Sequence, residues 1–91
     1  MNIAQKNLFK KAYKKLSGKE REQVNQAIQE ILADPLRGEE KKGDLAGIRV
    51  HKFPVQNQLC LLAYEVNADT LLLLALGVHE NFYRDLKKSE Q

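Results

Sequence analysis

Residues 71–84 read Leu-Leu-Leu-Leu-Ala-Leu-Gly-Val-His-Glu-Asn-Phe-Tyr-Arg, and this stretch decides the fold. Its six leading apolar residues predict a central strand covered on both faces, because a half-exposed strand would alternate polar and apolar residues. Gly77 then permits a sharp turn or a close approach by a ligand. His79 follows at the predicted start of a helix, where unpaired N–H groups favour an anion such as phosphate.

Two more strands are predicted upstream of this one. Residues 47–53 alternate, with Ile48 and Val50 on one face and Arg49, His51 and Phe53 on the other. Pro54 is expected to end or bulge this strand. Residues 59–66 form the second strand, and a short turn at 67–69 leads into the third, at 70–77. Connections this short indicate an antiparallel meander.

Helical patterns flank the strands. Apolar residues recur at helical spacing from Gln5 to Leu16, and Ser17-Gly-Lys-Glu20 matches a capping box that starts a second helix. Asp34-Pro35 ends that helix, because proline disfavours helical geometry in the residue before it. Residues 35–47 are charged and glycine-rich and are expected to be a loop. A last helix is predicted over 80–88, with Phe82 and Leu86 facing the core.

These elements predict an α+β fold in a single domain, residues 1–91. An N-terminal antiparallel helical hairpin should pack on a small antiparallel sheet of three strands, or four, followed by a short C-terminal helix. The first residues lack the apolar core of a signal peptide, and the longest apolar run is too short to span a bilayer. A cytoplasmic protein without membrane association is therefore expected.

Charge is distributed unevenly along the chain. The net charge is +3, and residues 1–19 carry six lysines and no acidic residue. This end should present a positive surface that attracts a polyanion, although a solvated helix face is the alternative interpretation. Lys10, Lys11 and Lys14 are the candidates for RNA contact.

The polar residues around the strands suit metal-independent RNA cleavage. A base must remove the 2′-hydroxyl proton, an acid must protonate the leaving 5′-oxygen, and cations must stabilise the charge on phosphorus. Histidine suits either proton role, so His51 and His79 are candidates, with Tyr83 four residues after His79. Arg49 can contact phosphate through its planar guanidinium.

Lys52 and Arg84 are further candidates for phosphate contact, although Lys52 should point away from Arg49 and His51. Each residue also has a structural interpretation: a surface histidine, a tyrosine partly in the core, an arginine paired with an acid. Cys60 is the only cysteine and is expected to be a small buried residue. No metal-ligand spacing, dinucleotide fingerprint or phosphate loop occurs, so no metal or cofactor is predicted.

Four phrases of the chain, taken in order, resemble the RelE/ParE superfamily of bacterial toxins from type II toxin–antitoxin systems. They are Phe9-Lys-Lys-Ala-Tyr-Lys-Lys-Leu16, Gly43-Asp-Leu-Ala-Gly-Ile-Arg-Val-His-Lys-Phe53, Leu61-Leu-Ala-Tyr-Glu-Val66 and Leu76-Gly-Val-His-Glu-Asn-Phe-Tyr83. The last phrase is similar to a glycine-X-histidine signature of ribosome-dependent mRNA endonucleases. Together the phrases span nearly the whole chain.

The resemblance implies a toxin that a cognate antitoxin protein neutralises and that cleaves mRNA in the ribosomal decoding site. By position it implies that Arg49 and His51 are the basic strand residues and that His79 is catalytic after the third strand. Tyr83 corresponds more loosely to a late catalytic tyrosine. The expected function is therefore a ribosome-dependent mRNA endonuclease, with ribosome, mRNA and antitoxin as partners.

Two departures from the family pattern keep alternatives open. Leu61 stands where many members carry an arginine, and the edge strand that usually precedes the helical hairpin is short or absent here. The alternatives are the branch of the superfamily that inhibits DNA gyrase without cleaving RNA, and a member that only binds its antitoxin or nucleic acid.

Overall fold

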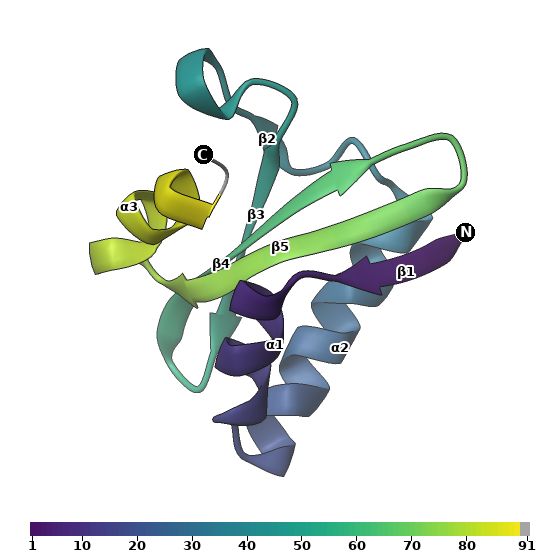
Figure 1. Ribbon diagram of the computed structural model, residues 1–91. Coiled ribbons are helices and arrows are strands. Elements are labelled where there is room, and N and C mark those ends of the chain that lie inside the picture. Colours follow the sequence, from purple (N-terminus) through teal and green to yellow (C-terminus); the bar gives the residue numbers. More distant parts are fainter. Residues whose placement is uncertain (90–91) are drawn as a thin grey trace.

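The computed structural model describes residues 1–89, without the side chains of residues 79–81 and 89. Five strands form one mixed sheet in the order β1-β5-β4-β3-β2 (Figure 1). The strands are β1 (Asn2–Gln5), β2 (Glu39–Glu40), β3 (Arg49–Val55), β4 (Gln58–Val66) and β5 (Thr70–Val78). The helices are α1 (Asn7–Lys14), α2 (Gly18–Ala33) and α3 (His79–Ser89), with a short 3-10 turn, η1 (Gly43–Leu45).

Strand β5 is buried on both faces, as its apolar run predicts. It lies between β1 and β4, and β3, β4 and β5 form the expected antiparallel meander. The register shifts opposite Ala63 and Tyr64, so that β5 contains one extra residue there. Because of this bulge, Leu74 and Ala75 both join the cluster on the α3 side, whereas Leu73 and Leu76 belong to the other cluster.

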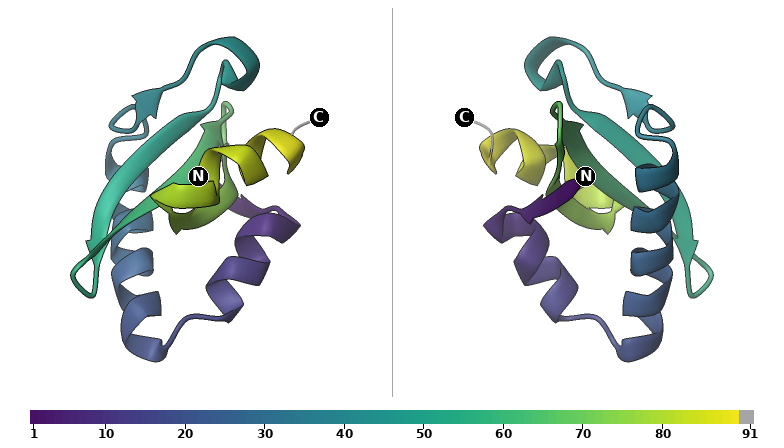
Figure 2. Two further views of the ribbon diagram at one scale, coloured as in Figure 1. Left: turned by 90° about the vertical axis from the view of Figure 1, so that its left-hand side faces the viewer. Right: turned by 90° about the vertical axis from the view of Figure 1, so that its right-hand side faces the viewer.

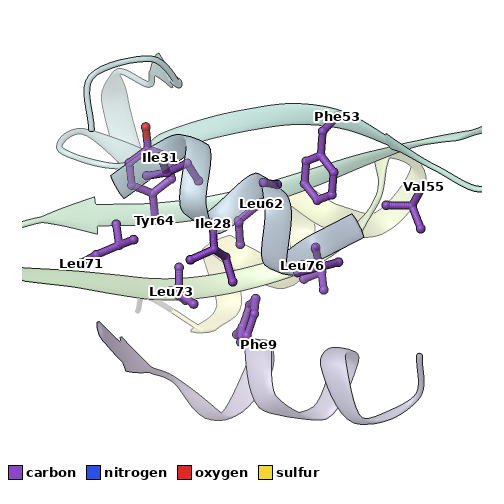
Figure 3. Close-up of a cluster of buried hydrophobic side chains, with 12 residues drawn as sticks. Phe9, Ile28, Ile31, Phe53, Val55, Leu62, Tyr64, Leu71, Leu73 and Leu76 are labelled. Carbon is purple, nitrogen blue, oxygen red and sulfur yellow. The ribbon is translucent and has the colours of Figure 1, made fainter. Parts of the chain in front are cut away.

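The two N-terminal helices cover one face of the sheet, and they splay apart from their short connection (Figure 2). The capping box is present: Ser17 Oγ accepts from the Glu20 N–H at 3.3 Å, and the Glu20 carboxylate accepts from the Ser17 N–H at 2.8 Å. Figure 3 shows Phe9 of α1 and Ile28 of α2 pointing toward Leu73 and Leu76. This packing is the larger hydrophobic core.

Helix α3 covers the opposite face of the sheet. Phe82 and Leu86 are buried against Leu61, Ala63 and Leu74, which confirms the predicted core face of this helix. The cluster also takes in Leu45 of η1 and Ile48, so the segment before β3 packs beside α3. The sheet is therefore enclosed by α1 and α2 on one side and partly by α3 on the other.

The prediction of three or four antiparallel strands was wrong in two respects. Strand β1 precedes the helices and pairs in parallel with β5, and β2 forms within the expected loop by pairing Glu39 with Val50 and Glu40 with Arg49. All four β1 side chains are exposed, so the sequence has no apolar alternation that would predict this strand. Backbone pairing with β5 holds it in place.

Two further local expectations need correction. Pro54 does not end β3, because the strand continues to Val55 and Pro54 pairs with Leu59. The other side of β3 is an open sheet edge at this point, where a proline is tolerated. Gly77 makes no sharp turn, because it lies within β5 opposite Leu61, and an added Cβ would meet Phe82 at an ordinary 3.7 Å.

Candidate functional site

Strand β3 sends its candidate residues to opposite sides of the sheet, as the alternation predicts. His51 pairs with Leu62, which belongs to the core beneath α1 and α2. Lys52 pairs with Leu61, which belongs to the core beneath α3. The sheet therefore separates Arg49 and His51 from Lys52.

Arg49 is engaged with the chain that follows α2. Its Nη1 donates to the carbonyl oxygens of Leu36 and Gly38 at 3.0 and 2.8 Å, and its Nη2 lies 3.8 Å from Glu40 Oε1. These contacts hold the segment after α2 and strand β2 against β3. Arg49 thus has the contacts of a structural residue.

His51 is buried, with 9% of its surface exposed, and its ring stacks on Phe53 with centroids 5.6 Å apart. Its Nε2 lies 3.6 Å from Glu30 Oε1 of α2 and has no hydrogen-bond partner among the described residues. Burial, and then the charge of Arg37, lower the pKa of His51 below the usual histidine value, although Glu30 acts in the opposite direction. This favours a neutral ring at the α2–β3 interface.

The other side of the sheet carries a second polar group, which we call the α3-side surface: Glu39, Lys41, Lys52 and Tyr83. Buried apolar residues lie beneath it, including Leu61, which is 0% exposed. Leu61 occupies the position where the superfamily resemblance places an arginine, so this is the side of the sheet on which that arginine would lie. Lys52, unlike Arg49 and His51, shares it.

Lys41 connects the segment after β2 to α3. Its Nζ lies 3.1 Å from Glu39 Oε1 and 5.0 Å from the centroid of the Tyr83 ring. Burial lowers the pKa of Lys41, but hydrogen bonds to Glu39 and Tyr83 outweigh it and leave that pKa above the usual lysine value. The hydrogen bond and charge of Lys41, with a smaller effect of Lys52, lower the pKa of Glu39. Both shifts favour the charged forms, so a Glu39 carboxylate and a Lys41 ammonium lie together beside the Tyr83 ring.

Sequence reasoning missed Glu39 and Lys41. They lie in a segment expected to be an irregular loop, and only the pairing of β2 with β3 places Glu39 diagonally across from Lys52 on the same face. The one available signal was the run Glu-Glu-Lys-Lys at residues 39–42, which resembles any solvated loop.

Helix α3 positions the remaining candidates. Its first residue is His79, as predicted, but the side chain of His79 lies outside what the structure describes. Tyr83 is half-buried and meets Phe82 edge-on, with centroids 5.2 Å apart. Arg84 is exposed one residue further on. Tyr83 is thus the residue that α3 contributes to the α3-side surface, among those whose side chains the structure describes.

Lys10, Lys11 and Lys14 are exposed on α1, and we call them the α1 lysine patch. They line a shallow hollow of about 430 Å³ with Tyr13 and Arg21. The guanidinium of Arg21 lies 5.3 Å from the centroid of the Tyr13 ring and donates to the Tyr13 and Lys14 carbonyls. Arg21 therefore adds a fixed positive charge to the patch.

Other chemistries find little support in the described part of the chain. Residues 1–89, apart from the side chains left undescribed, hold no group of three His, Cys, Asp or Glu residues that could bind a metal ion. Cys60 is half-buried, and burial raises the pKa of its thiol, which disfavours the reactive thiolate. No helix in the same part is long and apolar enough to cross a membrane.

Solved structures of one toxin share this fold. The free E. coli toxin RelE, in a form with two arginines changed to alanine, matches with a TM-score of 0.74 and 17% identity over 98% of this chain and 92% of that chain. A chain of the intact E. coli RelBE toxin–antitoxin complex matches with a TM-score of 0.68 and 20% identity, over 87% of this chain and 96% of that chain. Isolated E. coli RelE matches with a TM-score of 0.65 and 18% identity, over 96% of each chain.

The class that the fold defines is thus a small α+β protein built like the toxin RelE. The sequence narrows this class, because residues 3–87 match the family described as the ParE-like toxin of type II bacterial toxin–antitoxin systems. The chain belongs to this family, which confirms the RelE/ParE resemblance. No curated protein sequence matched the chain.

Proposed function

We propose that this toxin cleaves mRNA on the ribosome and that the α3-side surface is its active site. The observation that carries the proposal is the contact between Lys41 and the Tyr83 ring on the side of the sheet that also carries Lys52. His79 begins the helix that carries Tyr83. Two cations and a phenol on one surface suit a phosphodiester and its flanking oxygens. The likeness in fold to toxin RelE supports the assignment.

In this proposal His79 and Tyr83 move the two protons. The neutral imidazole of His79 takes the 2′-hydroxyl proton as the 2′-oxygen bonds to phosphorus, and the bond from phosphorus to the 5′-oxygen breaks. The Tyr83 hydroxyl gives its proton to the leaving 5′-oxygen. The products are a 2′,3′-cyclic phosphate and a 5′-hydroxyl, and water returns the proton from His79 to Tyr83.

Lys41, which Glu39 and Tyr83 hold in place, and the exposed Lys52 stabilise the negative charge that builds on the phosphate oxygens, because cations near that charge are worth most in the transition state. Arg84, one residue after Tyr83, contacts a neighbouring phosphate. Arg49 and His51 are left out of this mechanism, because their contacts lie on the α2 side of the sheet. They support the fold of the strand that carries Lys52.

The proposal includes a cognate antitoxin. The RelBE structure is described as an intact toxin–antitoxin complex, and we extend that kind of partnership to this chain. A partner segment that orders on binding could neutralise the toxin by covering its active surface.

Inhibition of DNA gyrase is the second candidate function, and Leu61 favours it. This fully buried leucine lies on the α3 side of the sheet and supplies no cation where many nucleases of the superfamily have arginine. In that case the α3-side surface would contact protein rather than cut RNA.

A reconstituted translation reaction tests both candidates. We expect the wild-type toxin to cut a defined mRNA only when ribosomes are present, and His79→Ala and Tyr83→Phe to lower the cleavage rate at least about 100-fold. The matched control is His51→Gln, which removes the other histidine and should retain cleavage if it folds. Intact mRNA together with inhibited DNA supercoiling would replace the nuclease proposal with gyrase inhibition.

A further inference from the structure

Glu39 occupies an unexpected place on the α3-side surface. Its carboxylate lies 3.1 Å from the ammonium of Lys41, and the charge of Lys52 also acts on it. A carboxylate beside two lysines presents the same kind of negatively charged oxygen that a phosphate would present there. The surface thus already contains an anion of its own.

The strand register explains why Glu39 faces this side. Glu39 pairs with Val50, which belongs to the core beneath α3, and Lys52 is the next β3 residue on that face. Such diagonal neighbours in a sheet are close enough for long side chains to interact. Glu40 pairs instead with Arg49, which its carboxylate approaches to 3.8 Å on the opposite face. Two adjacent glutamates therefore serve different sides of the sheet.

Lys41 is constrained more than an ordinary surface lysine. Its side chain is 20% exposed, and its ammonium lies over the Tyr83 ring at 5.0 Å. The Glu39 side chain is 63% exposed and makes its one described ion pair here, so it can swing into water at little cost. The cation is held in place, and its anion is the easily replaced member of the pair.

We propose that Lys41 and Lys52 form a phosphate-binding site for RNA and that Glu39 fills this site until an RNA phosphate displaces it. The inference rests on the proposed function, because it assigns the RNA phosphate to the same α3-side surface. Glu39 then acts as a built-in competitor that weakens binding to free RNA. RNA that other contacts already hold in place, as on a ribosome, displaces Glu39 more readily than free RNA does.

The test compares two single substitutions that remove the same charge from neighbouring residues. Binding of a fully 2′-O-methylated RNA oligomer, which lacks the attacking hydroxyl, is measured by fluorescence anisotropy for wild type, Glu39→Gln and Glu40→Gln. We expect Glu39→Gln to lower Kd roughly two- to fivefold relative to Glu40→Gln, the range of one exposed ion pair. Adding Lys41→Gln to Glu39→Gln should abolish this gain.

Equal tightening by the two glutamine variants would overturn the inference, because it would reflect net charge alone. A second pair guards against misfolding: Lys41→Gln should weaken binding more than Lys42→Gln, and equal losses would also overturn it. The proposed nuclease function and this inference about Glu39 can be rejected independently of each other. A selective gain in Glu39→Gln without any ribosome-dependent cleavage retains the phosphate site and rejects the nuclease, whereas cleavage with no selective gain does the reverse.

Discussion

At the scale of single residues, burial decides what a histidine can do. His51 and His79 are indistinguishable as residue types, yet His51 is enclosed between α2 and β3, stacked on Phe53. An imidazole in that place can hardly reach a substrate, but it can make folding depend on pH. The groups that face it are Glu30, which favours its charged form, and Arg37, which disfavours it.

The first prediction is that acid weakens the fold through His51. Its pKa is lowered in the folded state, so the unfolded chain binds the proton more readily as the pH falls through the ordinary histidine range. The free energy of unfolding should therefore drop on going from pH 7.5 to pH 5.5. Urea titrations at these two pH values should show a smaller drop for His51→Phe, which retains an aromatic ring against Phe53.

His79 is present in both proteins, so any titration of its own cancels in this comparison. An equal drop in wild type and His51→Phe would mean that His51 has the same proton affinity in both states.

At the scale of elements, a buried hydroxyl holds the connection from α2 to β2, in addition to the contacts of Arg49. Tyr64 of β4 is 0% exposed, its hydroxyl donates to the Pro35 carbonyl at 2.8 Å, and it accepts from the Gly38 N–H at 2.9 Å. Gly38 suits this approach, because a Cβ there would lie 2.7 Å from that hydroxyl. Figure 3 shows Tyr64 beside Ile31, near the end of α2. The hydroxyl thus ties the chain that leads to Glu39 and Lys41 onto the sheet.

The second prediction concerns this hydroxyl. Tyr64→Phe should lower the free energy of unfolding by about 1–3 kcal/mol, because two backbone groups lose a partner in the interior. Urea denaturation measures the change. The matched control is Tyr13→Phe, whose hydroxyl bonds Asn25 at an exposed site and should matter less than about 0.5 kcal/mol. Equal losses for the two variants would contradict the role assigned to Tyr64.

At the scale of the whole molecule, the two lysine-bearing surfaces named above lie on different sides of the sheet. The α1 lysine patch lies on the helix that packs on one face of the sheet, and the α3-side surface lies on the other face. A protein with cations on two sides can contact a structured RNA with one while the other handles the substrate. The two surfaces should therefore be separable by substitution.

The third prediction tests this separation. Lys10→Glu, Lys11→Glu and Lys14→Glu, made together, should weaken ribosome binding and flatten its salt dependence, since fewer counterions are released. The slope of log Kd against log salt should fall by up to about three, roughly one for each lost phosphate contact. Binding of the short 2′-O-methylated RNA to the α3-side surface should change much less. If the triple variant bound the ribosome as tightly as wild type at every salt concentration, the patch would not be part of the ribosome-binding surface.

Local patterns were sufficient to predict much of this chain. The Ser17–Glu20 capping box, the stop at Asp34-Pro35, the meander and the core residues Phe82 and Leu86 were all predicted correctly. Each depends on interactions within a few residues or on a repeating apolar face, which the sequence displays directly. The opposite orientations of His51 and Lys52 also followed from strand alternation alone.

Tertiary structure alone decided the rest. Strand β1 has no buried side chain and forms because its backbone pairs with β5. Strand β2 consists of two glutamates that are extended because they pair with β3. The sequence determined which side chains share a face of each strand, because that depends on a local period. Only the folded sheet decided that Glu39 and Lys52 share one face while His51 meets α2, because such meetings depend on pairing between distant segments.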